Sequence, residues 1–409
     1  MKKKSKLYDV IIVGAGLGGI VAAIEAARRG FHTLLLEKND RPGKKLLASG
    51  GGQCNITNRQ PISIFLKHYH EKEKFAGKSI QKYPPDFLIK WFSEIDVPMT
   101  TREDGKVFPA HGKAVCLLEA LISEMKSHQI GIKLSEAVNH VEKLEGLFVV
   151  DTNSNVYEGK NLIIATGGMS YPSLGTSGDG YQMATALGHR VIEPRPALAA
   201  VTINGHSLEA LAGIVLKEAH LEHWRNGNKK GKYTGDLLIT HEGLSGPVIL
   251  NYSRFFMDGD LLTLNIAAPF KEDMYAAELL RMTREAGKKQ VKSVLYKEHI
   301  PKRVIDRVLQ LADIKGDQTC ATLSKIQRKQ LAELLTGFPM KIECVMDFKA
   351  AMATAGGVAT EEVNGSTMES RLVPCLYFVG EVLDVDGMTG GYNLQFAFSS
   401  GFAAAMAIK

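Results

Sequence analysis

Near its N-terminus the chain passes from an apolar segment through a glycine-rich turn into a run of small residues. This succession constrains the fold more than any other feature. Residues 8–13 predict a buried strand, residues 14–19 fit the pattern G-x-G-x-x-G, and residues 20–29 predict a helix. In such a turn Gly14 permits the tight bend, Gly16 lets a pyrophosphate approach, and Gly19 lets helix and strand pack closely. The pattern therefore predicts a dinucleotide site at the positive end of a helix dipole.

The second predicted strand, residues 33–36, ends at a carboxylate. Glu37 follows Gly19 by eighteen residues, close to the spacing at which an acidic side chain accepts hydrogen bonds from the adenosine ribose. A carboxylate there also disfavours a 2′-phosphate, so the pattern favours FAD or NAD over NADP. The alternative interpretation of Glu37 is a solvated strand end.

Three further segments favour FAD over NAD. Residues 41–52 are basic and rich in glycine, and such a loop can follow a long cofactor from its pyrophosphate to its ring. Residues 132–156 alternate like a β-meander and precede an apolar strand that ends in Ala-Thr-Gly-Gly at 165–168, an order typical of FAD domains of the glutathione-reductase type. Gly380 and Glu381 supply a carboxylate where such folds bind the ribityl chain.

The stretch 380–395 predicts a strand end, an acidic turn, a glycine pair and the start of a helix. Backbone N–H groups of Asn393 and Leu394, at the positive end of that helix, can stabilise charge on the N1/C2 edge of a flavin. We therefore predict a flavin held between the two chain ends. The predicted cofactor-binding set is Gly14, Gly16, Gly19, Glu37, Lys38, Lys44, Lys45, Ser49, Gly50, Gly51, Val138, Thr166, Gly167, Gly380, Glu381, Asp386, Gly391, Asn393 and Leu394.

The middle of the chain has two different patterns of apolar residues. Residues 195–270 alternate like strands, whereas residues 271–340 have the period of helices. No second G-x-G-x-x-G follows a strand, so NADH or NADPH is expected as a transient reductant, or another protein reduces the flavin. We predict an α/β protein whose FAD-binding domain, residues 1–194 and 345–409, is interrupted by a β-rich subdomain, residues 195–270 and 341–344, and a helical subdomain, residues 271–340.

Composition excludes several other classes. The 409 residues suffice for two or three domains, and no apolar run approaches the roughly 20 residues of a membrane span. The basic N-terminus precedes a strand rather than a signal peptide, so we expect a cytoplasmic protein. The five cysteines form no C-x-x-C pair, which argues against a zinc site and a redox disulfide of adjacent cysteines. Nothing in the sequence sets the oligomeric state.

Positive charge is concentrated in the helical segment. Residues 271–341 contain fifteen Lys and Arg against nine Asp and Glu, an excess equal to the formal net charge of +6 of the whole chain. A basic helical module beside a neutral catalytic body can bind nucleic acid. The alternative is a lysine-rich helical surface that is only solvated.

Four segments, residues 43–58, 240–247, 354–358 and 380–395, resemble the signatures of the BaiN/RdsA-like (YhiN-like) family of bacterial FAD-dependent oxidoreductases. The resemblance spans essentially the full chain. It implies a Rossmann-like FAD domain interrupted by a β-barrel-like subdomain and a helical subdomain. It also implies reduction of uridine to dihydrouridine in large-subunit ribosomal RNA or, in one branch, of enone-containing bile-acid intermediates. Gln53 departs from the family, where arginine is common, so a charge near the flavin or substrate is expected to be missing.

Both substrate types contain an electron-poor C=C conjugated to a carbonyl, so hydride from the flavin N5 must be followed by a proton from a nearby acid. Cys54, just after the glycine loop, is one candidate; the alternative is a small apolar residue in the core. His241 is the second; the alternative is a structural histidine at a helix entry.

Three functions remain open from the sequence. The first is an FAD-dependent reductase of uridine in ribosomal RNA. The second is an NAD(P)H-dependent flavoprotein reductase or oxidase of a small enone or other small molecule, with no RNA role. The third is a non-catalytic, flavin-bearing RNA-binding factor.

Overall fold

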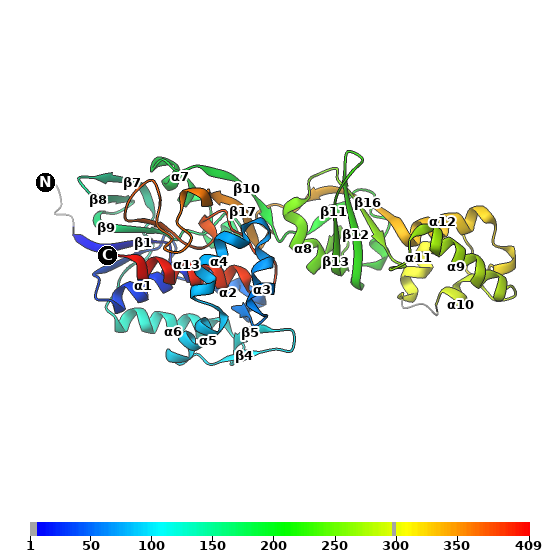
Figure 1. Cartoon of the computed structure of the whole chain (residues 1–409), viewed down its shortest axis with the longest axis horizontal. Coiled ribbons are helices and arrows are strands. Elements are labelled where there is room, and N and C mark those ends of the chain that lie inside the picture. The colour runs from blue at the N-terminus through cyan, green and yellow to red at the C-terminus, as the bar shows by residue number, and fades with distance from the viewer. Residues whose placement is uncertain (1–5, 297–299) are drawn as a thin grey trace. The chain divides into compact units, whose positions relative to one another are not determined.

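The computed structural model describes residues 6–296 and 300–409, and Figure 1 traces the whole chain. The chain folds into two compact units: unit 1 is Met1–Leu198 with Asp347–Lys409, and unit 2 is Ala199–Met346. The boundary predicted after residue 194 falls within strand β10 (Val191–Ala197) of unit 1. Strand β10 pairs with β17 (Ala353–Val358) in a two-stranded sheet, and its register shifts between Ile192 and Arg195. Pro194 is tolerated there because the bulged, two-stranded ribbon does not require its missing N–H.

A seven-stranded sheet forms the centre of unit 1, in the order β6-β2-β1-β9-β8-β7 with β18 also paired to β9. Its strands are β1 (Leu7–Val13), β2 (Thr33–Leu36), β6 (Gly131–Lys133), β7 (Val138–Leu144), β8 (Leu147–Thr152), β9 (Val156–Ile164) and β18 (Leu376–Phe378). Strands β7, β8 and β9 are antiparallel, whereas β6, β2, β1, β9 and β18 are parallel. The predicted α/β class, with a Rossmann-type domain and a meander, is confirmed.

Strand β9 joins the meander to the parallel part of the sheet. Its first half pairs with β8 and its last three residues, Leu162–Ile164, pair with β18, while β1 accompanies its other edge. The carboxyl ends of β1, β2, β9 and β18 consequently meet at one edge of the sheet. Ligands of open α/β sheets bind outside that edge.

The first and last helices of the chain pack together. Helix α1 (Leu17–Arg28) and helix α13 (Tyr392–Ala407) lie side by side, blue and red in Figure 1. They approach closely because both carry small residues: a Cβ on Gly401 would lie 2.3 Å from the Gly18 carbonyl oxygen. The remaining elements of unit 1 are α2 (Lys44–Ala48), β3 (Thr57–Asn58), α3 (Ile62–Phe65), α4 (Glu73–Lys82), α5 (Pro85–Glu94), β4 (Met99–Thr101), β5 (Lys106–Pro109), α6 (Ala114–Ser127) and α7 (Asp179–Ala186).

Unit 2 contains a closed barrel in the order β11-β14-β13-β12-β15-β16. Its elements are β11 (Val201–Ile203), β12 (Val215–Arg225), β13 (Asn228–Ile239), β14 (Gly243–Ser245), α8 (Pro247–Tyr252), β15 (Leu261–Asn265), α9 (Glu272–Glu285), α10 (Val291–Leu295), α11 (Lys302–Leu311), α12 (Lys325–Gly337) and β16 (Phe338–Val345). One apolar core runs through barrel and helices and includes Leu264, Val308 and Leu335. The segments with strand-like and helical patterns are therefore two parts of one packed unit.

Among the residues that the structure describes, no helix has the length and apolar character that crossing a bilayer requires.

Candidate functional site

A cavity of about 610 Å³ lies at the carboxyl edge of the parallel strands of unit 1. Residues that directly follow β1, β2, β9 and β18 line it, and so do the N-termini of α1 and α13. Seventeen of the predicted cofactor residues lie on its wall: Gly14, Gly16, Glu37, Lys38, Lys44, Lys45, Ser49, Gly50, Gly51, Val138, Thr166, Gly167, Gly380, Glu381, Gly391, Asn393 and Leu394.

Two residues of the predicted set are absent from the wall. A Cβ on Gly19 would lie 1.9 Å from the Gly14 carbonyl oxygen, so Gly19 is required for packing of helix against strand. Asp386 is buried, with 2% of its surface exposed, and does not line the cavity.

Gly14 and Gly16, the other two glycines of the N-terminal turn, differ in what a side chain at each position would contact. Gly14 has a φ of +104°, and a Cβ there would lie 2.5 Å from the Ala165 carbonyl oxygen. Gly16 has an ordinary φ of −77°, and a Cβ there would meet no protein atom within 4 Å. The protein therefore does not itself require glycine at position 16. The open space beside Gly16 faces the cavity, where a pyrophosphate would lie.

The carboxylate of Glu37 ties the ends of β1 and β2 together. Its Oε2 accepts the backbone N–H of Ala15 at 2.8 Å, and its Oε1 accepts the backbone and side-chain N–H groups of Asn39 at 2.9 and 2.7 Å. Only 8% of Glu37 is exposed. Because a carboxylate has about four acceptor positions, capacity remains for a ribose hydroxyl.

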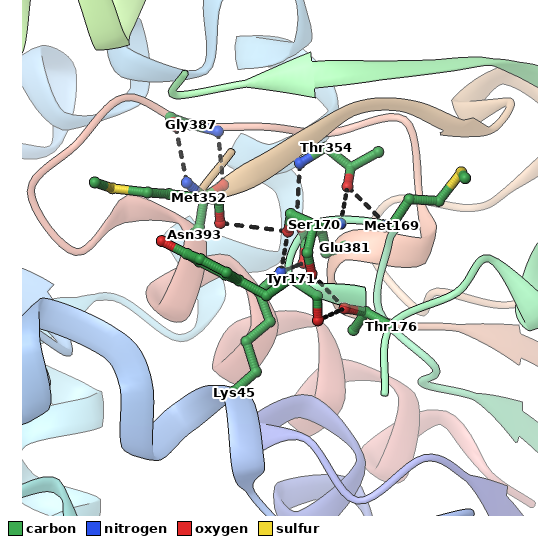
Figure 2. Close-up of polar contacts among 10 residues, drawn as sticks. All are labelled: Lys45, Met169, Ser170, Tyr171, Thr176, Met352, Thr354, Glu381, Gly387 and Asn393. Atoms are coloured by element: carbon green, nitrogen blue, oxygen red, sulfur yellow. Dashed lines mark hydrogen bonds and ion pairs between the residues drawn. The ribbon is translucent and has the colours of Figure 1, made fainter. Parts of the chain in front are cut away.

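A second carboxylate, Glu381, is the centre of a polar network in the cavity wall (Figure 2). Its Oε2 lies 2.5 Å from the Lys45 Nζ, and its Oε1 accepts the Thr354 N–H at 2.8 Å and the Ser170 hydroxyl at 3.2 Å. The Lys45 ammonium also donates to Ser170. Both oxygens of Glu381 thus already have partners within the protein, and they fix the positions of three separate segments.

The loop after β9 is fixed by the same network. The fully buried Thr354 hydroxyl oxygen accepts the backbone N–H groups of Met169 at 2.8 Å and Ser170 at 3.1 Å. A Cβ on Gly168 would lie 2.4 Å from that oxygen. Thr176 closes the other side of the loop, because its hydroxyl donates to the Ser170 carbonyl oxygen.

The start of α13 is fixed by a reciprocal pair of hydrogen bonds, drawn in Figure 2. The Gly387 N–H donates to the Asn393 Oδ1 at 2.8 Å, and the Asn393 Nδ2 donates to the Gly387 carbonyl oxygen at 2.8 Å. Gly391 precedes the helix with a φ of +98°, and a Cβ there would lie 2.7 Å from the Thr57 Cα. The positive end of a 16-residue helix therefore borders the cavity.

Two buried polar atoms on the cavity wall have no protein partner among the described residues. They are the Thr166 Oγ1 and the Asn55 Oδ1. Buried polar atoms are rarely left without a hydrogen bond, so these atoms point to a polar ligand. Together with the space at Gly16 and two helix N-termini, they fit FAD, which supplies hydride transfer when bound.

Cys54 and His241, the two residues predicted as proton donors, do not line the cavity. Cys54 is 0% exposed, packs in the apolar core and does not line the cavity. Burial raises the pKa of its thiol to about 11. This placement favours the interpretation of Cys54 as a small apolar residue over that of a proton donor. His241 is exposed on the turn between β13 and β14 of unit 2, so the two residues belong to different units.

The departure at Gln53 is accompanied by a nearby cation. The exposed Gln53 accepts a hydrogen bond from the Arg102 Nη2 at 2.8 Å, so a guanidinium stands beside this position although the residue itself is not arginine. Sequence reasoning also missed Tyr171, a half-buried residue on the cavity wall. No local motif marks it, because its backbone conformation depends on distant segments.

Comparisons with known proteins agree with this architecture. The model of the HI0933-like protein Rossmann domain matches residues 8–407. The chain is 32% identical to the ribosomal RNA dihydrouridine synthase of Escherichia coli (strain K12), covering 97% of both chains. It is 30% identical to the 3-dehydro-bile acid delta(4,6)-reductase of Clostridium scindens, over 97% of this chain and 98% of that protein.

Solved structures share the fold at low sequence identity. The E. coli quinol fumarate reductase FrdA superposes with a TM-score of 0.53 at 15% identity, covering 100% of this chain and 70% of that one. The 3-ketosteroid delta1-dehydrogenase of Sterolibacterium denitrificans gives a TM-score of 0.52 at 14% identity, covering 99% of both chains.

Proposed function

Because the chain belongs to the HI0933-like family of Rossmann-domain proteins and is an FAD-dependent oxidoreductase, we propose that it reduces a conjugated C=C, with a uridine of ribosomal RNA as its substrate. Dihydrouridine is the product, and NADH or NADPH is the reductant. Two relatives with 31 and 32% identity over almost their full length, from Haemophilus influenzae and E. coli, are named for this activity.

The observation that carries the proposal is the cavity of unit 1, with its space beside Gly16 and with the Thr166 Oγ1 and Asn55 Oδ1, which have no hydrogen-bond partner in the part of the chain that the structure describes. In the proposed reaction Glu37 and the N-termini of α1 and α13 bind the cofactor. The Lys45–Glu381 pair holds the wall rigid, so that the reacting ring has a fixed position. Tyr171, Met352 and Met388 supply an apolar part of the wall, against which a planar unsaturated ring can lie.

Unit 2 offers a surface for the phosphate backbone of RNA. Lys288 and Lys289 are exposed and Lys292 is half-buried, and none of the three has an acidic partner among the described residues. By contrast, Arg281 on α9 is neutralised by Glu278 at 2.5 Å and Glu285 at 2.7 Å. Unpaired lysines can exchange their counterions for phosphates, which favours binding of nucleic acid at low salt.

A small enone is the second candidate substrate. The relative from Clostridium scindens supports it, because its name describes reduction of a 3-dehydro-bile acid. Both substrates require the same chemistry in unit 1, and they differ only in whether the basic surface of unit 2 takes part.

Mass spectrometry of ribosomal RNA from cells with and without the gene tests the proposal. Without the gene, one uridine-containing fragment should be lighter by two hydrogen atoms, and the wild-type gene should restore the heavier mass. A Gly16→Val gene should fail to do so. Unchanged RNA together with turnover of 2-cyclohexen-1-one would favour the small-molecule candidate. Purified protein whose flavin neither NADH nor NADPH reduces would instead favour a non-catalytic flavin-bearing factor.

A further inference from the structure

Tyr171 is held on the cavity wall by its backbone rather than by its side chain. It has left-handed backbone angles, with a φ of 56° and a ψ of 61°, a region that a residue with a bulky side chain seldom occupies. Its N–H donates to the Phe348 carbonyl oxygen at 2.8 Å, and its own carbonyl oxygen accepts the Leu174 N–H at 2.8 Å and the Thr176 hydroxyl at 3.1 Å. These bonds maintain the unusual conformation. Such outliers accumulate at functional sites.

The phenol of Tyr171 takes no part in the surrounding polar network. Figure 2 shows its ring extending away from the hydrogen bonds of Ser170 and Thr354, and none of the interactions drawn there ends on its hydroxyl. The residue is half-buried and lines the cavity. Among the described residues, no hydrogen bond or ion pair involves the Tyr171 hydroxyl, so this group of a cavity-lining residue is available to a substrate.

The other protic side chains on the wall are engaged elsewhere. Lys38 pairs with Asp179, Lys44 with Asp40 and Lys45 with Glu381. The Ser49 hydroxyl donates to the Leu46 carbonyl oxygen at 2.6 Å. The Thr176 hydroxyl donates to backbone. The Thr166 hydroxyl has no partner within residues 6–296 and 300–409, but an aliphatic alcohol is a much weaker acid than a phenol. Among these groups, the Tyr171 hydroxyl is therefore the phenolic donor without a competing protein partner, and it can supply a proton to carbon.

We propose that the Tyr171 hydroxyl is the acid that protonates the substrate, an assignment that rests on the proposed function. The C=C of the conjugated carbonyl gains a hydride from the reduced flavin at one carbon and a proton from Tyr171 at the other. Two C–H bonds form and the π bond is lost. The tyrosinate then takes a proton from water, and the nicotinamide dinucleotide, oxidised by two electrons, restores the reduced flavin.

The two half-reactions of the FAD-loaded enzyme separate this role from others. Tyr171→Phe keeps the ring and removes only the hydroxyl, whereas Tyr171→Ala removes both. Tyr181→Phe is the matched control, because the buried Tyr181 hydroxyl has no partner among the described residues and Tyr181 does not line the cavity. Tyr171→Phe should leave flavin reduction by NADPH unchanged. It should slow oxidation of the reduced enzyme by 2-cyclohexen-1-one and by an unmodified ribosomal RNA fragment about 10²-fold or more.

Each outcome decides the assignment. A Tyr171→Phe enzyme as fast as wild type overturns it, and a defect limited to Tyr171→Ala would make the ring only a packing surface. If Tyr181→Phe is equally slow, the loss is structural and the assignment also fails. If the wild-type enzyme forms no product from either probe, both the Tyr171 assignment and the proposed function are wrong. If the wild type and Tyr171→Phe are equally active, only the Tyr171 assignment is wrong.

A measurement independent of turnover tests the position of the phenol. Tetranitromethane should nitrate Tyr171 in cofactor-free protein and spare the buried Tyr181, as peptide mass spectrometry would show. Addition of FAD and 2-cyclohexen-1-one should protect Tyr171. Nitration that persists at the same rate with both present would contradict the placement of the hydroxyl beside the substrate.

Discussion

The Lys45 Nζ lies 2.5 Å from the Glu381 Oε2, and this ion pair joins helix α2 to the turn that follows β18. The lysine and glutamate side chains are 28% and 17% exposed, so removal of one charge leaves the other partly desolvated and alone. The pair lines the cavity, and its loss should affect both stability and cofactor retention.

Glu381→Gln should lower the stability of the protein by about 1–3 kcal/mol, the usual cost of leaving a half-buried group without its partner. It should also weaken FAD binding. The double variant Lys45→Gln/Glu381→Gln should recover part of the stability, because neither charge then remains unpaired. Thermal unfolding of the four proteins in a double-mutant cycle measures this coupling. Purely additive losses would show that the pair contributes nothing.

Gly16→Val should abolish FAD retention without unfolding the protein, because a side chain at Gly16 meets no protein atom within 4 Å. Gly19→Ala is the matched control: its Cβ would lie 1.9 Å from the Gly14 carbonyl oxygen, so it should destabilise the fold itself. Purified wild-type protein should be yellow and release FAD rather than FMN on denaturation. Full FAD occupancy in folded Gly16→Val protein would contradict the prediction that the pyrophosphate binds at this turn.

Cys54→Ala should leave flavin reduction and substrate turnover close to wild type, because the thiol is buried outside the cavity wall. Its pKa, raised by burial to about 11, keeps the thiol protonated near pH 8. Iodoacetamide reacts with thiolates, so the exposed Cys344 should be labelled well before Cys54 in the native protein. A large, selective loss of substrate reduction in Cys54→Ala would restore the role of this thiol as the acid.

Replacing Lys288, Lys289 and Lys292 with Gln should weaken binding of ribosomal RNA fragments and reduce its dependence on salt. Each phosphate that the protein no longer neutralises should lower the log–log slope by about 0.7 for single-stranded RNA. Gln at Lys90, Lys106 and Lys160 removes the same charge from ion-paired lysines of unit 1 and should have little effect. The flavin spectrum should be unchanged in both triple variants. Equal RNA affinity across salt concentrations would leave this surface merely solvated and favour the small enone.

Local patterns predicted the frame of the site well. The strand at 33–36 and the glycine turn at 14–19 are short-range features, since their conformations depend on residues close in sequence. Glu37 could be placed on the wall because parallel strands end at the same edge of a sheet.

Side-chain direction was less accessible from sequence. Cys54 follows a loop that lines the cavity, yet its left-handed backbone, with a φ of 58°, accompanies a side chain buried in the core. Tyr171 faces the cavity because its N–H is bonded to Phe348, a residue that returns to unit 1 only after the insertion. Contacts between segments so far apart leave no periodic signal, and they override local preferences.

The packing of α1 against α13 has a consequence for biosynthesis. Ten consecutive residues of α1, Leu17–Ala26, are buried, and α13, which packs on them, is translated only after the whole of unit 2. A nascent chain therefore carries the apolar face of α1 uncovered while all of unit 2 is being made. Unit 2, whose segment is continuous, can fold in the meantime. Competence to capture a flavin should consequently appear only after α13 has emerged from the ribosome, and a ribosome stalled before α13 would display a nascent chain without flavin.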